Sequence, residues 1–169
     1  VMPKRCAHCK SFGAYFCNDC FKKITIKPEK RSYFSAKRRL HIISCVEFQE
    51  KIVKEMIHAF KYDGIEEIGV YIAPIMREVI SRFQNLFQNT DIVIPVPIHK
   101  RKYFERGYNQ SEIIAKQCFK KWLVRNDVLI RKHYTASQTG LTKEQRTKNI
   151  TGAFKVVKHN AVFQKRVVL

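Results

Sequence analysis

The stretch Asp91–Gln110, DIVIPVPIHKRKYFERGYNQ, decides the expected fold of this chain. Its apolar start predicts a strand that ends at Pro95 and Pro97, because proline has no backbone donor and fixes its own φ. A helix is expected from Gln110 to about Leu123, with Asn109 as its N-cap. The order strand, loop and helix is therefore predicted for this stretch.

The segment between the expected strand and helix is rich in basic residues. Backbone N–H groups and the positive end of a helix dipole point towards whatever such a loop holds. The sequence therefore predicts an anion site in the loop. Its charged and polar members are His99, Lys100, Arg101, Lys102 and Arg106, and it ends at Gly107.

Composition bounds the size of the protein and the sign of its partners. A chain of 169 residues suits one ordinary core with a small appendage. Its 33 Lys and Arg residues against 14 Asp and Glu residues leave a formal net charge of +19. This balance favours anionic partners, namely phosphates, nucleic acid or an anionic membrane surface, although plain solvation of a basic protein is the alternative.

The sequence also bears on location. No apolar stretch near the start resembles a signal peptide, and no run approaches the roughly 20 apolar residues of a membrane span. A cytoplasmic protein is therefore expected. Six cysteines would be unusual as disulfides in that compartment, which favours another use for them.

Four cysteines form two C-x-x-C knuckles, Cys6 with Cys9 and Cys17 with Cys20, separated by seven residues. This spacing places four thiolates around one tetrahedral ion, so a structural zinc site is predicted. Two redox-active pairs are the alternative, but each would need a strand before it and a helix after it. His8 is a further candidate that could replace one cysteine as a ligand.

The segments before the opening stretch are predicted from periodicity. The polar residues 21–39 are interpreted as a connector, and Leu40–Phe48 as a strand. Apolar residues at helical spacing predict a helix over Gln49–Tyr62 and another over Ile65–Gln88, which Pro74 should kink or divide.

After the opening stretch, short apolar segments again predict strands. These are Val128–Arg131, Ala153–Val157 and Gln164–Leu169, the last of them expected to be buried. The polar residues His133–Thr147 between them are predicted to be a functional loop or a surface linker. Alternating helices and short strands favour an α/β fold, with a parallel sheet flanked by helices.

Four segments carry a recognisable pattern, namely Cys6–Cys20, His58–Gly64 (HAFKYDG), Ile94–Ala115 and Arg131–Phe154. Together they resemble one known family, the ComF/GntX competence proteins, over nearly the whole chain. The resemblance implies a small N-terminal zinc module, residues 1–30, followed by a type I phosphoribosyltransferase-like domain, residues 31–169. It also implies a cytosolic role in natural transformation, acting on incoming single-stranded DNA.

The resemblance assigns roles to individual residues. The loop after the first strand of the phosphoribosyltransferase-like sheet would hold pyrophosphate, and the polar segment His133–Thr147 would close over a bound substrate. The implied pyrophosphate-binding residues are Pro97, His99, Arg101, Arg106, Gly107, Asn109 and Gln110, the implied loop residues are Thr135, Gln138, Arg146 and Asn149, and the implied zinc ligands are Cys6, Cys9, Cys17 and Cys20.

The chain departs from the family at its C-terminal end. Family members continue into two acidic residues and a Thr-Thr-Gly turn, which cradles the ribose phosphate of phosphoribosyl pyrophosphate. This sequence ends before that turn, so a C-terminally truncated and incomplete sheet is expected. The chain is then predicted to bind rather than to catalyse turnover. A longer gene product would restore the enzyme hypothesis, with Mg as a further cofactor.

Three functions follow from these expectations. The first is a phosphoribosyltransferase of nucleotide metabolism, or binding of phosphoribosyl pyrophosphate without turnover. The second is single-stranded DNA binding, since aromatic residues interleaved with cations suit stacked bases and phosphates. The third is a zinc-stapled module that docks a competence helicase or a DNA-uptake channel. The aromatic residues are Tyr33, Phe34, Tyr103, Phe104 and Tyr134.

Overall fold

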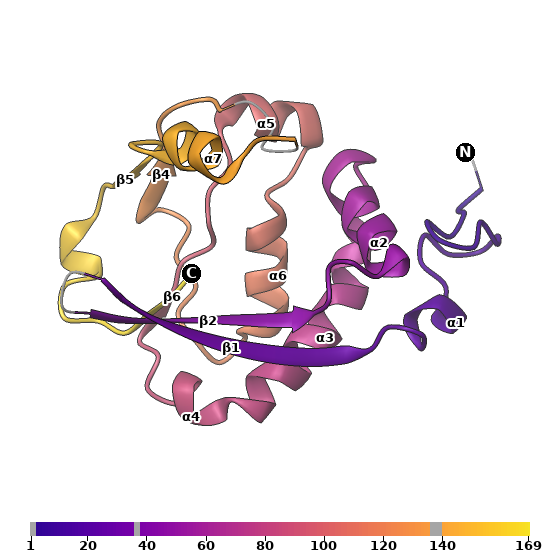
Figure 1. Cartoon of the computed structure of the whole chain (residues 1–169), viewed down its shortest axis with the longest axis horizontal. Coiled ribbons are helices and arrows are strands. Elements are labelled where there is room, and N and C mark those ends of the chain that lie inside the picture. The colour runs from indigo at the N-terminus through magenta and orange to yellow at the C-terminus, as the bar shows by residue number, and fades with distance from the viewer. Residues whose placement is uncertain (1–2, 36–37, 136–139) are drawn as a thin grey trace. The chain divides into compact units, whose positions relative to one another are not determined.

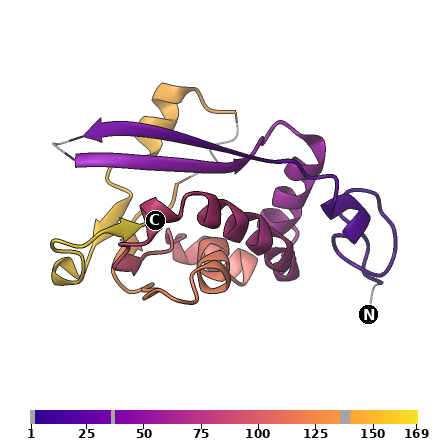
Figure 2. The same cartoon turned by 90° about the horizontal axis from the view of Figure 1, so that it is seen from below.

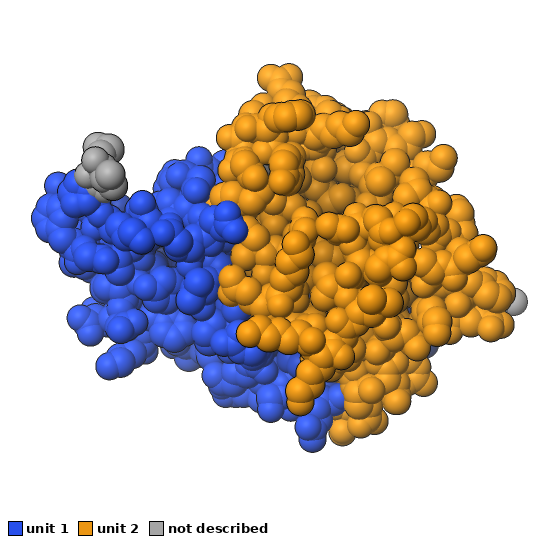
Figure 3. All heavy atoms as spheres, turned by 180° about the vertical axis from the view of Figure 1, so that it is seen from behind, with its two compact units in different colours: residues 1–84 blue, residues 85–169 orange. Residues whose placement is uncertain are grey.

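The computed structural model describes residues 3–35, 38–135 and 140–169. The chain divides into two compact units, residues 1–84 and residues 85–169 (Figure 3). This division rests on compactness alone. The predicted boundary between a zinc module, residues 1–30, and a second domain, residues 31–169, stays a prediction.

The first unit begins with the cysteine loop, which is the segment Cys6–Cys20, and a long hairpin. The loop ends in the short helix α1, Asn18–Phe21, and the antiparallel hairpin pairs β1, Ile26–Ser35, with β2, Arg38–Val46 (Figure 1). The predicted strand Leu40–Phe48 is confirmed as β2, with shifted ends. The prediction of a connector was wrong for the residues that form β1. This polar segment has little hydrophobic alternation of its own, and it is a strand because its backbone hydrogen-bonds to β2.

Two helices complete the first unit. Helix α2, Lys51–Tyr62, matches its prediction, and the turn η1, Glu66–Ile68, leads into α3, Gly69–Arg82. The predicted division at Pro74 was wrong, because α3 continues through this residue to Arg82. The predicted kink at Pro74 stays a prediction. Pro74 removes only the backbone hydrogen bond to the carbonyl of Val70, a residue that is itself exposed. The short helix α4, Gln84–Phe87, follows.

The core of the first unit joins the helices to the cysteine loop. The largest fully buried side chains of α2 and its neighbours are Val53, Met56, Phe60, Ile68 and Val79. Phe16, from the cysteine loop, is also fully buried, and its ring meets the edge of Tyr71 on α3 at 5.8 Å between centroids. The cysteine loop is therefore packed onto α3 through an aromatic contact.

The second unit combines helices with parallel and antiparallel strands, which confirms the α/β class. Strand β3, Ile92–Val93, runs parallel to β6, Val167–Val168, and β4, Leu129–Arg131, pairs antiparallel with β5, Phe154–Val156. Ile92, Ile94 and Val128 form a small core cluster beneath them.

The strands at either end of this unit are shorter than predicted. After Ile94 donates to the carbonyl of Val168, at 2.8 Å, Pro95 and Pro97 offer no further donor, so β3 stops. The expectation of a buried final strand was wrong as well. Leu169 is 70% exposed, because β6 pairs with β3 along two residues only.

Helix α5, Lys100–Arg106, occupies most of the predicted anion loop. The loop itself was predicted without helix, yet residues 100–106 form α5, which is capped by His99, whose ring nitrogen accepts from the backbone of Arg101 at 3.2 Å. Gly107 ends α5 in the left-handed conformation, with φ of 84°. This cap and this glycine are helix signals that the basic composition obscured.

The helix predicted after Asn109 is confirmed as α6, Gln110–Cys118, although it ends earlier than expected. The chain turns at Phe119, which is buried and packs its ring against Trp122 at 5.5 Å between centroids. The predicted polar loop is also partly helical, because α7, Lys143–Ile150, begins with a capping box between Thr142 and Gln145.

Within the described ranges, no helix combines the length and the apolar composition needed to cross a membrane.

Replacing Gly107 by Ala should lower the free energy of unfolding by about 1–2 kcal/mol, the usual cost of a side chain in the left-handed region. A Cβ atom at this position would meet nothing within 4 Å, so the effect comes from the backbone alone. Urea unfolding measures it, with Gly107→Asn as the milder control. Equal stability of all three proteins would contradict the assigned backbone conformation.

Candidate metal centre and anion site

Four cysteine side chains converge in the first unit. The sulfur atoms of Cys6, Cys9, Cys17 and Cys20 all lie within 4.8 Å of one another, and those of Cys9 and Cys17 are 3.6 Å apart. A tetrahedral zinc ion with Zn–S bonds of about 2.3 Å requires sulfur atoms about 3.8 Å apart. The cluster therefore fits a metal ion with four thiolate ligands, as the spacing predicts.

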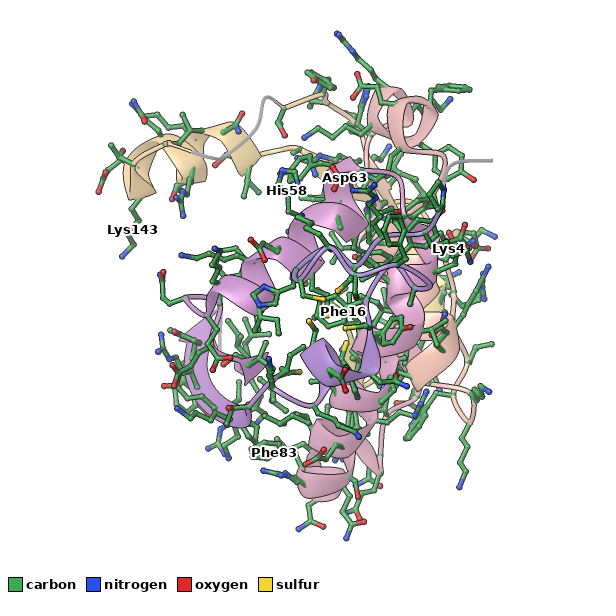
Figure 4. All side chains as sticks on the ribbon, turned by 90° about the vertical axis from the view of Figure 1, so that its right-hand side faces the viewer. Lys4, Phe16, His58, Asp63, Phe83 and Lys143 are labelled. Atoms are coloured by element: carbon green, nitrogen blue, oxygen red, sulfur yellow. The ribbon has the colours of Figure 1, made fainter. Side chains whose placement is uncertain are left out.

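Local backbone structure places these cysteines. Cys6 donates its backbone N–H to the carbonyl of Ser11 at 2.8 Å, and Lys10 donates to the carbonyl of Cys6 at 3.0 Å, which folds the first knuckle into a tight turn. The backbone N–H of Cys17 points at the sulfur of Cys6, at 3.4 Å. Sulfur atoms appear near the labelled Phe16 in Figure 4, and Phe16, which directly precedes Cys17, is fully buried.

The thiols differ in how readily they lose a proton. The Ser11 hydroxyl, hydrogen-bonded to the sulfur of Cys9 at 3.1 Å, lowers the pKa of Cys9 to about 6. Burial and neighbouring thiols raise the pKa of Cys20. Because only the thiolate binds a metal, Cys9 is ready to bind at neutral pH, whereas Cys20 must release its proton when the metal enters.

His8 lies inside the first knuckle but faces another partner. Its Nδ1 atom is 2.6 Å from a carboxylate oxygen of Glu55 on α2. The described thiol cluster consists of the four cysteines, and His8 is not among the residues that gather there. Its contact with Glu55 instead ties the knuckle to α2.

The variant Cys9→Ser should bind less metal than the wild type, because one of four ligands is lost. Metal content per chain, measured on protein purified with zinc, checks this, and chelation should lower the melting temperature of the wild type more than that of Cys9→Ser. Cys45→Ser is the matched control, since Cys45 is half-buried and outside the cluster. Wild-type metal content in Cys9→Ser would contradict the site.

In the second unit, basic side chains of α5 gather around one tyrosine. The guanidinium of Arg101 lies 4.9 Å from the ring centroid of Tyr134, and the ammonium of Lys102 lies 5.7 Å from it. The His99 ring meets the same tyrosine edge-on, at 5.5 Å between centroids. The start of α5 is therefore brought against the segment that follows β4.

A second group of cations surrounds Lys102. Burial lowers the pKa of Lys102, and the positive charges of Arg131 and Arg106 lower it further. Arg131 donates to the hydroxyl of Thr135, and its guanidinium lies 5.2 Å from the ring of Phe154. Its Nε atom is buried and, within the described part of the chain, has no hydrogen-bond partner. Mutually repelling cations with a spare donor are typical of an anion site.

Two predicted site residues, Asn109 and Gln110, link α6 to the segments before it. The side chain of Asn109 accepts from the backbone of Ser111 at 3.1 Å and donates to the carbonyl of Val96 at 3.2 Å. The side-chain oxygen of Gln110 accepts from Arg106 at 2.6 Å. Asn109 and Gln110 are both buried, so these contacts position α6 against the proline segment.

The other predicted site residues fall in three places. Half-buried Pro97 lies two residues after the buried Pro95, and Gly107 lies between α5 and α6. Thr135 is buried against Arg131, and Gln138 lies outside the described residues. Arg146 and Asn149 lie on α7, where Arg146 donates to the carbonyl of Leu141 at 3.0 Å. Their roles in closing over a ligand stay predictions.

The structure adds Arg131 to the residues selected from the sequence and brings it close to Lys102 of the predicted anion loop. Lys102 belongs to the basic stretch of α5, and Arg131 is the last residue of β4. Arg131 also begins the last of the four family-like segments, which was the available signal. Its contact with Lys102 joins residues far apart in the chain, so the pairing itself could not be predicted from spacing.

Comparison with known proteins identifies relatives. The chain is 24% identical to competence protein F of Haemophilus influenzae over 170 residues, which is 97% of this chain and 69% of that protein. It is 29% identical to the DNA utilization protein YhgH of Escherichia coli O157:H7, and 26% identical to YhgH of Salmonella typhimurium, in both cases over 60% of this chain and 46% of the relative. No family model matches the chain. The relationship to competence protein F confirms the predicted resemblance to the ComF family.

Proposed function

We propose that this chain, a relative of competence protein F, acts in natural transformation by binding incoming single-stranded DNA in the cytosol. The observation that carries the proposal is the group of cations around Lys102, formed by Arg106 and Arg131, beside the ring of Tyr134. The names of the relatives supply the link to competence and DNA use. The chain spans less than half of the YhgH proteins, so their whole activity is not transferred to it.

The chemistry of this group suits a nucleic-acid strand. Phosphates would relieve the repulsion among Lys102, Arg106 and Arg131, which supplies binding energy without any sequence preference. Tyr134 is 43% exposed and would offer an aromatic surface for a base, next to Arg101. A formal net charge of +19 would add long-range attraction for the same strand.

A second candidate is binding of pyrophosphate or phosphoribosyl pyrophosphate, as in phosphoribosyltransferases of nucleotide metabolism. The N-terminus of α6, capped by Asn109, follows directly after Arg106 and Gly107, and helix N-termini favour phosphates. Pyrophosphate and DNA phosphates would then compete for the same cations. Turnover would also require side chains that hold the ribose, and a Mg ion.

A third role concerns the metal centre. The four-cysteine module would dock a competence helicase or a DNA-uptake channel, while the second unit binds the strand. The contacts of His8 with Glu55 and of Phe16 with Tyr71 support a rigid surface for such docking. With four thiolates around the ion, no ligand position stays open for catalysis, which favours zinc in a structural role.

Binding of a labelled oligodeoxythymidine should weaken steeply as salt rises, with a slope of about 0.7 per phosphate neutralised. Lys102→Gln and Arg131→Gln should each weaken binding and reduce this slope by about that amount. Lys54→Gln, an exposed lysine on α2, is the matched control for charge. Affinity that does not change with salt would overturn the proposal.

The pH dependence of binding should identify Lys102. Because its pKa lies below the ordinary value of 10.5, this lysine loses its charge at lower pH than the other lysines as the pH rises. Affinity for an oligodeoxyadenosine should therefore fall earlier in the wild type than in Lys102→Arg, which stays charged. Titrations across the alkaline range measure the difference. Identical profiles would exclude a role for Lys102 at the bound phosphate.

A further inference from the structure

The hairpin of the first unit is a second basic and aromatic feature, separate from the anion site of the second unit. Strands β1 and β2 form a long two-stranded ribbon, with pairing that runs out to Ser35 and Arg38 (Figure 2). Over residues 26–46 the sequence has six basic residues and one acidic residue, Glu29. The basic residues are Lys27, Lys30, Arg31, Lys37, Arg38 and Arg39.

Two aromatic side chains stand out near the free end of this ribbon. Phe34 is 75% exposed and Tyr33 is 47% exposed. Since neighbouring residues of a strand point to opposite faces, the two rings lie on opposite faces of the ribbon. Phe34 pairs across the strands with Arg39, whose guanidinium lies 5.2 Å from the ring centroid.

The face that carries Tyr33 combines exposed apolar side chains with the charged pair of Arg31 and Glu29. Tyr33 pairs with Leu40, and the next pair on that face joins Arg31 to Ile42. Leu40 and Ile42 are each about half exposed, whereas His41 and Ile43 on the opposite face are more buried. Exposed apolar side chains that lie together usually mark a surface with a partner.

We propose that the free end of the β1–β2 ribbon binds single-stranded nucleic acid, with bases stacked on Phe34 and Tyr33. Arg39 and Lys30 would contact the phosphates, because Arg31 is already held by Glu29 through two hydrogen bonds of 3.0 Å. This inference rests on the proposed function, to which it adds a second contact with the strand. Such stacking is tolerant of sequence, since every base has a flat face.

The distribution of the rings favours a nucleic-acid strand over an anionic membrane. A flat lipid surface meets one face of a ribbon, so it would take up either Tyr33 or Phe34. A flexible strand can pass around the end of the ribbon and stack a base on each ring. In a single strand each base lies near a phosphate. Arg39, whose guanidinium lies beside the Phe34 ring, could therefore contact the phosphate of a base stacked on that ring.

The test measures binding of a labelled oligodeoxythymidine to the full chain and to the variants Phe34→Ala and Tyr33→Ala. Each loss of stacking should weaken binding about 5- to 140-fold, from the usual 1–3 kcal/mol per base. Phe163→Ala is the matched control, because Phe163 is a 72% exposed ring in the second unit. Phe34→Trp should retain binding, and the oligomer should quench the new tryptophan.

Three outcomes would overturn the inference. If the wild type binds the oligomer and Phe34→Ala and Tyr33→Ala bind it equally well, the ribbon is not a binding site, and the proposed function is unaffected. A wild type that does not bind the oligomer would remove both. The third outcome comes from measuring binding to vesicles of phosphatidylcholine with phosphatidylglycerol. If the variants lose vesicle binding but keep oligomer binding, the ribbon contacts a membrane and not a nucleic acid.

Discussion

The side chain of Asn109 links the strand exit to the helix that follows, and the arrangement of the second unit depends on it. One end of this amide caps α6 and the other holds the carbonyl of Val96, which the flanking prolines leave outside any sheet. Gln110, the next residue, holds Arg106. Burying a polar side chain costs little free energy when both of its ends are hydrogen-bonded, and the two bonds fix its geometry. A side chain with only one of these bonds would leave a buried polar group without a partner. The cations of α5 are thereby presented from a rigid base.

The same framework explains why the basic side chains repel one another without separating. Lys102 and Arg106 stand on one short helix, and Arg131 comes from β4, so their backbones are held by independent elements. Contacts of Arg131 with Thr135 and Phe154 hold the guanidinium in place. The protein stores electrostatic repulsion that a bound anion would release. Preorganised charge of this kind raises affinity because little side-chain freedom is lost when the ligand arrives.

Local sequence signals predicted much of the fold, and long-range contacts account for what they missed. Strong periodicity identified α2, and the Asn109 cap identified α6. Strand β1 was missed because its pairing with β2, and not its own pattern, makes it a strand. The four cysteines could be found from spacing, since close ligands in sequence are close in space. Arg131 could not, because no local pattern reports that the residues after β4 return to α5.

The fully buried Phe16 has a consequence for how the first unit responds to its surroundings. It directly precedes Cys17 and its ring packs on Tyr71, so the cysteine loop and α3 share one small core. A metal bound by the cysteines would hold that loop closed over the ring, and its loss would expose apolar surface of α3. Since proteases act on such opened states, metal supply would set how much of the chain persists as folded protein.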